Sequence, residues 1–180
     1  LLVATLVTFF VYVGVEVGTG QWTFSHLLGL GTPRALAGAA VSAYWAALTA
    51  GRLALAVLGN RAGPSVLLLG GCGVALAGAV AYLVFPSGVA AVAAVALLGL
   101  GFAGTFPLLM SLTSRRVGEG QTPYVVGYVL GSANVGSSLV VAGMGVGMQA
   151  LGVAVLPLFI LAGVVVLLLL NLLMERLVRG

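Results

Sequence analysis

The chain has 180 residues, of which 62% are apolar and 6% charged, whereas a soluble domain is usually about 45–50% apolar and about 25% charged. So few charged side chains cannot coat a soluble globular domain, and the composition also excludes a disordered segment. The net charge of +4 comes from seven arginines against three acidic residues, too few cations to follow a phosphate backbone, which excludes a nucleic-acid-binding protein. These exclusions leave an integral membrane protein embedded in the lipid bilayer.

Prolines beside polar or glycine breaks divide the chain into six apolar stretches. A proline fits the first turn of a helix, and about 20 apolar residues are enough to cross the hydrocarbon layer. Stretches such as 164–170 lack the alternating polarity of strands in a membrane barrel. We therefore expect residues 1–180 to form one all-α bundle of six transmembrane helices, in two successive groups of three, at about residues 1–30, 34–58, 65–85, 88–112, 124–150 and 155–174.

The first residue, Leu1, lies inside the first apolar run, without the Met and the basic segment that open a signal peptide. We interpret Leu1 as a truncation point within a spanning helix, and we expect the chain to be a piece of a longer protein.

Arginines are distributed unevenly between the two sides of the expected bundle. The side that holds both termini carries six of them, and the opposite side carries only Arg34. Because arginine and lysine gather on the cytoplasmic side of membrane proteins, we expect a multi-pass protein of the cell membrane with both ends of this segment in the cytoplasm. The six are Arg52, Arg61, Arg115, Arg116, Arg176 and Arg179.

The first span contains a carboxylate, Glu16, far from either end. A charge at that depth costs about 2.5–3.5 kcal/mol even on a lenient insertion scale, so we expect Glu16 to face a cavity or a partner. Spacings of three and four residues place it on one helix face with other polar side chains. We interpret this face as a wet surface that binds solute or carries a proton; the alternative is a structural contact, such as a pair between Glu16 and an arginine or a hydroxyl. The face consists of Tyr12, Glu16, Thr19, Thr23 and His26.

Small residues interrupt the first and fourth spans, the opening helices of the two groups. Glycine or proline breaks at matching places in two repeats are a pointer to a midplane site in a transporter. The alternative, which is compatible with the first, is close helix packing through small residues. The residues are Gly14, Gly18 and Gly20 in the first span, and Gly99, Gly101, Gly104 and Pro107 in the fourth.

The second and fifth spans also carry polar side chains on one face. In the second span this face ends at Arg52, which can reach the membrane interface. In the fifth, Asn134 needs a hydrogen-bond partner, either on another helix or on a solute. The third and sixth spans are almost free of polar residues, so we expect them to be outer, lipid-facing supports. The faces are Gly38, Ser42, Trp45, Thr49 and Arg52 in the second span, and Gly127, Gly131, Asn134 and Ser138 in the fifth.

No sequence motif indicates an enzyme. Residues 99–104 spell G-x-G-x-x-G, but they lie inside an apolar helix and not between a strand and a helix, so a nucleotide site is not expected. One histidine, His26, and one cysteine, Cys72, are too few for a metal cluster, and no serine lies in a G-x-S-x-G elbow. We expect no catalytic residues, no metal and no cofactor.

Residues 12–22, 44–63, 99–107, 126–136 and 152–170, in this order, resemble the seventh, eighth, tenth, eleventh and twelfth spans of major facilitator superfamily transporters of the fucose-permease type, which are sugar–proton symporters. The loop after the second span resembles the superfamily signature G-x-x-x-D-R-x-G-R/K in a degenerate form. Asn60 stands where an acid is usual, and Pro64 where a basic residue is usual.

The resemblance implies the C-terminal half of a twelve-helix secondary transporter, in which two six-helix bundles rock about a midplane site. The implied partners are the N-terminal half, the lipid bilayer, a small polar solute such as a sugar, and a proton. Together with the polar faces, it gives the solute-binding candidates Glu16, Gln21, Trp22, Tyr44, Phe106 and Asn134, whose aromatic members would stack on the solute. The hinge and gating candidates are Gly18, Gly104, Pro107, Arg52 and Arg61.

Two other functions are compatible with the same sequence. One is a drug or metabolite exporter of the same architecture, which would depend more on aromatic than on amide side chains. The other is an autonomous six-helix membrane protein that acts as a dimer. The proton-linked permease is the interpretation that the resemblance favours.

Overall fold

The computed structural model of the chain describes residues 2–58, 62–117 and 122–179. As expected, these ranges contain six helical stretches that are long and apolar enough to cross a membrane, the fourth of which consists of two helices. The elements are α1 (Leu2–Gly29), α2 (Arg34–Leu58), α3 (Pro64–Val84), α4 (Gly88–Phe102), α5 (Thr105–Val117), α6 (Thr122–Leu151), the short 3-10 helix η2 (Val153–Val155) and α7 (Leu156–Arg179).

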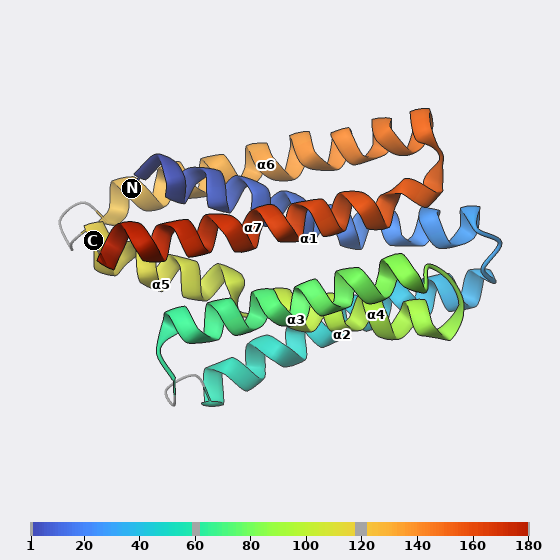
Figure 1. Cartoon of the computed structure of the whole chain (residues 1–180), viewed down its shortest axis with the longest axis horizontal. Helices are drawn as coiled ribbons and strands as arrows, with labels where there is room; N and C mark the ends of the chain where they lie inside the picture. Colours follow the sequence, from blue (N-terminus) through green and yellow to red (C-terminus); the bar gives the residue numbers. More distant parts are fainter. Residues whose placement is uncertain (1, 59–61, 118–121, 180) are drawn as a thin grey trace.

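Both termini lie at one end of the bundle, which we call the terminal end (Figure 1). The opposite, distal end holds the links α1–α2, α3–α4 and α6–α7. Each of these short links contains or adjoins a glycine with positive φ, a conformation that residues with a Cβ adopt rarely. The three residues are Gly31 (77°), Gly88 (70°) and Gly152 (90°). Glycine therefore allows the chain to reverse within a few residues at the distal end.

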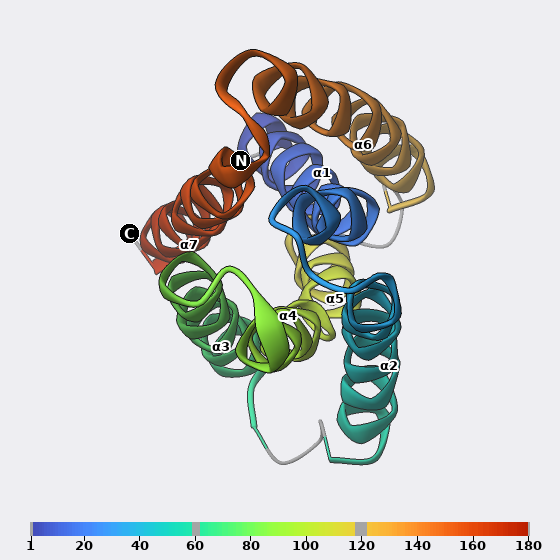
Figure 2. The ribbon, with the colours of Figure 1, turned by 90° about the vertical axis from the view of Figure 1, so that its right-hand side faces the viewer.

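The helices of each three-helix group pack mainly against helices of the other group. Helix α1, the first of its group, packs along α6, the second helix of the other group, and α4 packs in the same way along α2. The third helices, α3 and α7, contact each other, and each also packs against the first helix of the other group. Seen along the axis, α2 and α6 lie on one side of the bundle and α3 and α7 on the other, with α1, α4 and α5 between them (Figure 2). This two-fold pattern fits the expected two groups of three.

Glycines let α1 approach α6, and α4 approach α2, closely. A methyl group at Gly136 of α6 would overlap the backbone of Phe10 in α1, and one at Gly99 of α4 would overlap the backbone of Tyr44 in α2. In lipid, helices are held together largely by such close packing, because lipid tails are as apolar as the side chains. The α1–α6 and α2–α4 seams therefore depend on glycine at these positions.

The fourth span is broken at Ala103 and Gly104, between α4 and α5. Pro107 explains the place of the break, because it has no N–H to donate to the carbonyl four residues earlier, that of Ala103, and its ring crowds this carbonyl. At the break, the Ala103 N–H donates to the Leu100 carbonyl at 3.3 Å, one residue closer than in an α-helix.

Helix α1, by contrast, is continuous, so the expected matching break in the first span is wrong. Its glycines make room for neighbouring side chains instead: Gly14 and Gly18 face Val140 and Met144 of α6, and Gly20 faces an indole of α2. No proline follows them within α1, and glycine alone weakens a helix by only about 1 kcal/mol. Helix α1 is thus continuous where it packs along α6.

Candidate functional site

The carboxylate of Glu16 lies halfway along α1 and is almost fully buried, with 8% of the residue exposed. The hydroxyl of Tyr12, one helical turn earlier, donates to its Oε2. Arg52 of α2 approaches from the other side, with Nη2 3.3 Å from Oε1. Tyr44 of α2 donates its hydroxyl to the main-chain carbonyl of Glu16 at 2.8 Å. Glu16 is thus held by groups from two helices.

The ion pair joins the buried interior to an open surface. The side chain of Arg52 is 45% exposed, whereas that of Glu16 is 10% exposed. A buried carboxylate is costly unless a charge and hydrogen bonds compensate it, and Arg52 and Tyr12 supply both. Of the two sequence interpretations of Glu16, pairing with an arginine is therefore observed. Because Arg52 extends to the surface of α2, the pair is also within reach of a ligand or water at that surface.

The rest of the polar face of α1 points into the bundle. All of its members are buried, so the five side chains share one face as predicted, but the expectation of a wet face is wrong along most of its length. Two threonines bond to their own helix: Thr19 donates to the Val15 carbonyl at 2.7 Å, and Thr23 to the Thr19 carbonyl at 2.6 Å. At the distal end, His26 Nδ1 lies 2.7 Å from the Val153 carbonyl of η2.

An aromatic cluster lies between Glu16 and the terminal end. The ring of Phe106, on α5, meets Phe9 edge-on with centroids 5.5 Å apart and lies 6.5 Å from the ring of Tyr12. Phe102, the last residue of α4, packs against the same tyrosine at 6.2 Å. Phe106 was predicted to stack on a solute, and in this structure its ring lies against these aromatic neighbours.

Two exposed polar surfaces flank α1. On α2 the predicted stripe is exposed at Ser42, Trp45, Thr49 and Arg52. On α6, Asn134 and Ser138 are exposed, and the Asn134 amide donates back to the Leu130 carbonyl of its own helix at 2.9 Å, a partner that neither sequence interpretation included. Gln21 of α1 is exposed as well. Helices α2 and α6 lie on the same side of the bundle (Figure 2), so we call this side the α2–α6 face.

Sequence reasoning missed two aromatic residues on this face. Tyr124 and Tyr128 of α6 are 76% and 65% exposed. Their spacing of four residues, next to the stripe of Gly127 and Gly131, was a usable signal, because it places both rings beside the exposed polar residues. An exposed tyrosine can offer both a ring and a hydroxyl to a ligand.

Trp22 and Gly18 lie in the α1–α6 seam. The indole N–H of Trp22 donates to the Val141 carbonyl of α6 at 2.9 Å, and its ring covers Gly145. Gly18 faces Met144. The hinge candidates Gly104 and Pro107 lie at the break of the fourth span, whereas Arg61 lies outside the described residues.

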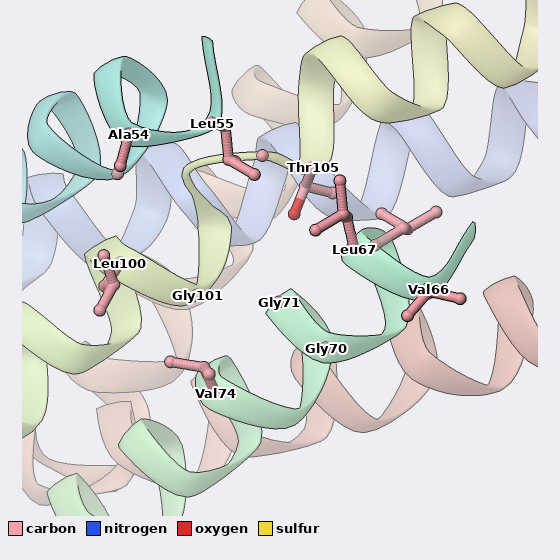
Figure 3. A pocket seen from close by; sticks show the side chains of 13 residues that line it. Ala54, Leu55, Val66, Leu67, Gly70, Gly71, Val74, Leu100, Gly101 and Thr105 are labelled. Carbon is pink, nitrogen blue, oxygen red and sulfur yellow. The ribbon is translucent and has the colours of Figure 1, made fainter. Parts of the chain in front are cut away.

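Two cavities lie beside the break. A cavity of about 360 Å³ lies between α2, α3 and the α4–α5 break, and its lining is apolar apart from Thr105 (Figure 3). A smaller one of about 200 Å³ is lined by Arg52 and Pro107 among other residues. The larger cavity lacks the polar groups that would orient a polar solute. In the part of the chain that the structure covers, no three His, Cys, Asp or Glu side chains lie close enough to share a metal ion.

Solved structures of peptide transporters superpose on almost the whole chain. A variant of the peptide transporter POT in complex with alafosfalin matches with a TM-score of 0.85 and 22% identity, over 97% of this chain and 38% of that chain. Its complex with sulfate matches with a TM-score of 0.84 and 21% identity, over 97% and 37%. The in meso crystal structure of the POT family transporter PepTSo matches with a TM-score of 0.78 and 17% identity, over 97% and 36%. This chain therefore spans little more than a third of each of them, and at these identities the likeness shows the fold alone.

Among curated proteins, none matches the chain. A family model does match it: residues 1–141 fit the model described as Major Facilitator Superfamily. This match covers α1 to α5 and most of α6, including the Glu16–Arg52 pair and the break of the fourth span. The six helices that are long and apolar enough to span a membrane agree with this match. The matched family points to a transporter and not to an enzyme. The chain belongs to the Major Facilitator Superfamily.

Proposed function

We propose that this chain is the C-terminal half of a secondary transporter of the fucose-permease type, which carries a small polar solute such as a sugar by alternating access, coupled to a proton. The observation that carries the proposal is the Glu16–Arg52 pair, which links a buried carboxylate to the exposed α2–α6 face. The N-terminal companion bundle is part of the proposal, since this chain spans little more than a third of the matched transporters. In this arrangement the N-terminal half would lie against the α2–α6 face, and the terminal end would be cytoplasmic.

The polarity of the α2–α6 face supports a polar solute. Exposed hydroxyl and amide groups at membrane depth need water, a solute or another helix as partner, because lipid tails offer no hydrogen bonds. Gln21 is suited to sugar hydroxyls, because an amide both donates and accepts. The Ser138 hydroxyl donates to the Asn134 carbonyl of its own helix at 3.0 Å, and its oxygen can still accept from a sugar hydroxyl. Arg52 adds a cation that can bind a solute oxygen. Glu16 supplies the proton site, because a carboxylate that gains a proton loses its attraction for Arg52 and frees the guanidinium.

Uptake by the complete protein in proteoliposomes tests the proposal. A panel of labelled sugars, amino acids and dipeptides is offered with and without a proton gradient; dipeptides belong to the panel because the matched structures are of peptide transporters. We expect sugar uptake that responds to the gradient. Glu16→Gln, which keeps the size of the side chain, should lower uptake about tenfold or more, because a hydrogen bond to a charged group contributes about 1.5–3 kcal/mol. It should also remove the response to pH.

The control is Glu175→Gln, at the terminal end of α7, where Glu175 accepts from Ser65 at 2.6 Å and lies far along the bundle from Glu16. This variant should transport as the wild type does. Wild-type uptake by Glu16→Gln at every pH would remove Glu16 from the transport site, and uptake of dipeptides without sugars would replace the proposed solute class.

The second candidate is an exporter of lipophilic compounds. It is favoured by the exposed aromatic rings of Trp45, Tyr124 and Tyr128 on the same face, which offer apolar contact area to a solute with few hydroxyls.

A further inference from the structure

We propose that Tyr12 is a positioning residue that couples the bend of the fourth span to the protonation of Glu16. The inference deepens the proposed function and rests on it for its role in transport, but the coupling itself is a property of the folded protein. It starts from one juxtaposition: the two rings on either side of the α4–α5 break pack against the one tyrosine that donates to the carboxylate.

The first step is the placement of the rings relative to the break. Phe102 is the last residue of α4, and Phe106 is the second residue of α5, so only Ala103, Gly104 and Thr105 separate them. Their centroids lie 6.2 Å and 6.5 Å from that of Tyr12. If α5 changes its angle to α4, the two rings move relative to each other, and the fully buried ring of Tyr12 must follow one of them.

The second step is the freedom of the break to change its angle. Pro107 removes one hydrogen bond of the helix at this point. The cavity of about 360 Å³ is lined by Gly104 of the break and by Gly101 and Thr105 on either side of it; the latter two are labelled in Figure 3. Because interiors are otherwise close-packed, unfilled space beside an interrupted helix is where a change of bend displaces the fewest side chains.

The third step is the electrostatic effect at Glu16. In the described part of the chain, the charged or titratable groups recorded at this carboxylate are Tyr12 on α1, and Arg52 and Tyr44 on α2. Of these three groups, only Tyr12 has a ring in the aromatic cluster with Phe102 and Phe106. The ring of Tyr44, on α2, packs against that of Trp45 instead. Moving its hydroxyl changes the hydrogen bonding of the carboxylate, and hydrogen bonding is one of the three causes that set the protonation of an acid.

Infrared difference spectroscopy of the purified complete protein measures the coupling without transport. Spectra recorded as a function of pH give the midpoint of the Glu16 band, which is assigned by its loss in Glu16→Gln. Tyr12→Phe keeps the ring and removes the hydroxyl, and should shift the midpoint by about one pH unit, the size expected for a hydrogen bond to a charged group. Phe106→Leu, which changes the ring contact alone, should shift the midpoint by a smaller amount.

The double variant distinguishes coupling from a general disturbance. In the Tyr12→Phe background, Phe106→Leu should cause no further shift, because the link between ring and carboxylate is already cut. Phe159→Leu, on α7, is the matched control: it also removes an aromatic ring from helix packing, against Gly147, and should leave the midpoint unchanged. Circular dichroism verifies that each variant is folded.

Three results would overturn the proposal: an unchanged midpoint in Tyr12→Phe, equal shifts from Phe106→Leu in both backgrounds, or a Glu16 band that does not titrate over the pH range in which the protein stays folded. The proposed function fails separately, in the uptake assay. A normal titration shift together with absent sugar uptake would keep the coupling and discard the solute.

Discussion

A single carboxylate in the middle of α1 is contacted by two neighbouring side chains, Tyr12 on its own helix and Arg52 on the next. The i, i+4 spacing that brings Tyr12 to Glu16 can be read from the sequence, because it is a property of one helix. The pairing with Arg52 could only be offered as one alternative, because it depends on how far α2 slides along α1, and packing sets that register. Side chains predicted from single-helix periodicity therefore lie on the expected faces, while their partners required the structure.

At the same scale, amide and aromatic side chains of the α2–α6 face separate the two candidate functions. For a sugar permease, Gln21→Leu should lower uptake about tenfold, because it removes hydrogen bonds to hydroxyls and leaves them unpaired. Trp45→Leu should then have a smaller effect. For an exporter of lipophilic compounds the order reverses, because ring contact dominates. Initial rates in proteoliposomes, compared at equal protein content, decide between them.

At the scale of the helix, glycine and proline have different effects: glycine allows close packing, and proline interrupts the helix. A stripe of glycines looks the same in a helix that bends and in a helix that packs closely. In α1 the glycines face α6 and α2, and the helix is continuous. In the fourth span a proline follows, and the helix breaks four residues before it. The number and approximate extent of the helices could be predicted from hydropathy and proline positions, but the role of each glycine depended on its neighbour.

A pair of glycines on α6 tests this distinction. Gly136→Ala should destabilise the bundle by about 1–3 kcal/mol, because the methyl group would overlap the Phe10 backbone of α1, which cannot move aside. Gly131→Ala, five residues earlier on the same helix, meets no atom within 4 Å and should be neutral or slightly stabilising. Unfolding in mixed micelles, followed by far-ultraviolet circular dichroism, measures both. Equal effects would show that the α1–α6 seam does not need glycine.

For the whole molecule, the two sides of the bundle differ in what they expose. The α2–α6 face carries hydroxyl, amide and guanidinium groups, whereas the exposed side chains of α3 and α7 between their ends are aliphatic, as in Val80 and Leu169. The two polar residues of α3 and α7 at mid-length, Cys72 and Asn171, are buried and contact each other, with Nδ2 and Sγ 3.8 Å apart. Composition showed that the chain is a membrane protein, and the scarcity of polar residues in the third and sixth spans predicted that they are outer supports. The exposed aliphatic side chains of α3 and α7 agree with that prediction.

Thiol labelling measures this difference in the complete protein. Ser138→Cys, on the α2–α6 face, should react with a water-soluble, membrane-impermeant methanethiosulfonate reagent, because a thiol reacts as the thiolate, which forms in water. Leu169→Cys, on the outer side of α7, is 59% exposed but should react far more slowly. The native Cys72 is buried and should contribute little background. Faster labelling at Leu169→Cys would place water on the opposite side of the bundle.

The packing of the two three-helix groups against each other has a consequence for biosynthesis. Of the spans in this chain, α1 is synthesised first, but α6, its most extensive neighbour, is synthesised only after three further spans. During this interval α1 places the Glu16 carboxylate in the hydrocarbon layer. Its cationic partner, Arg52, is synthesised with the next span, α2. The hairpin of α1 and α2 is thus the earliest piece that can rest in the bilayer without an uncompensated charge. Loss of Arg52 would then appear first as poor insertion, before any mature protein could be assayed.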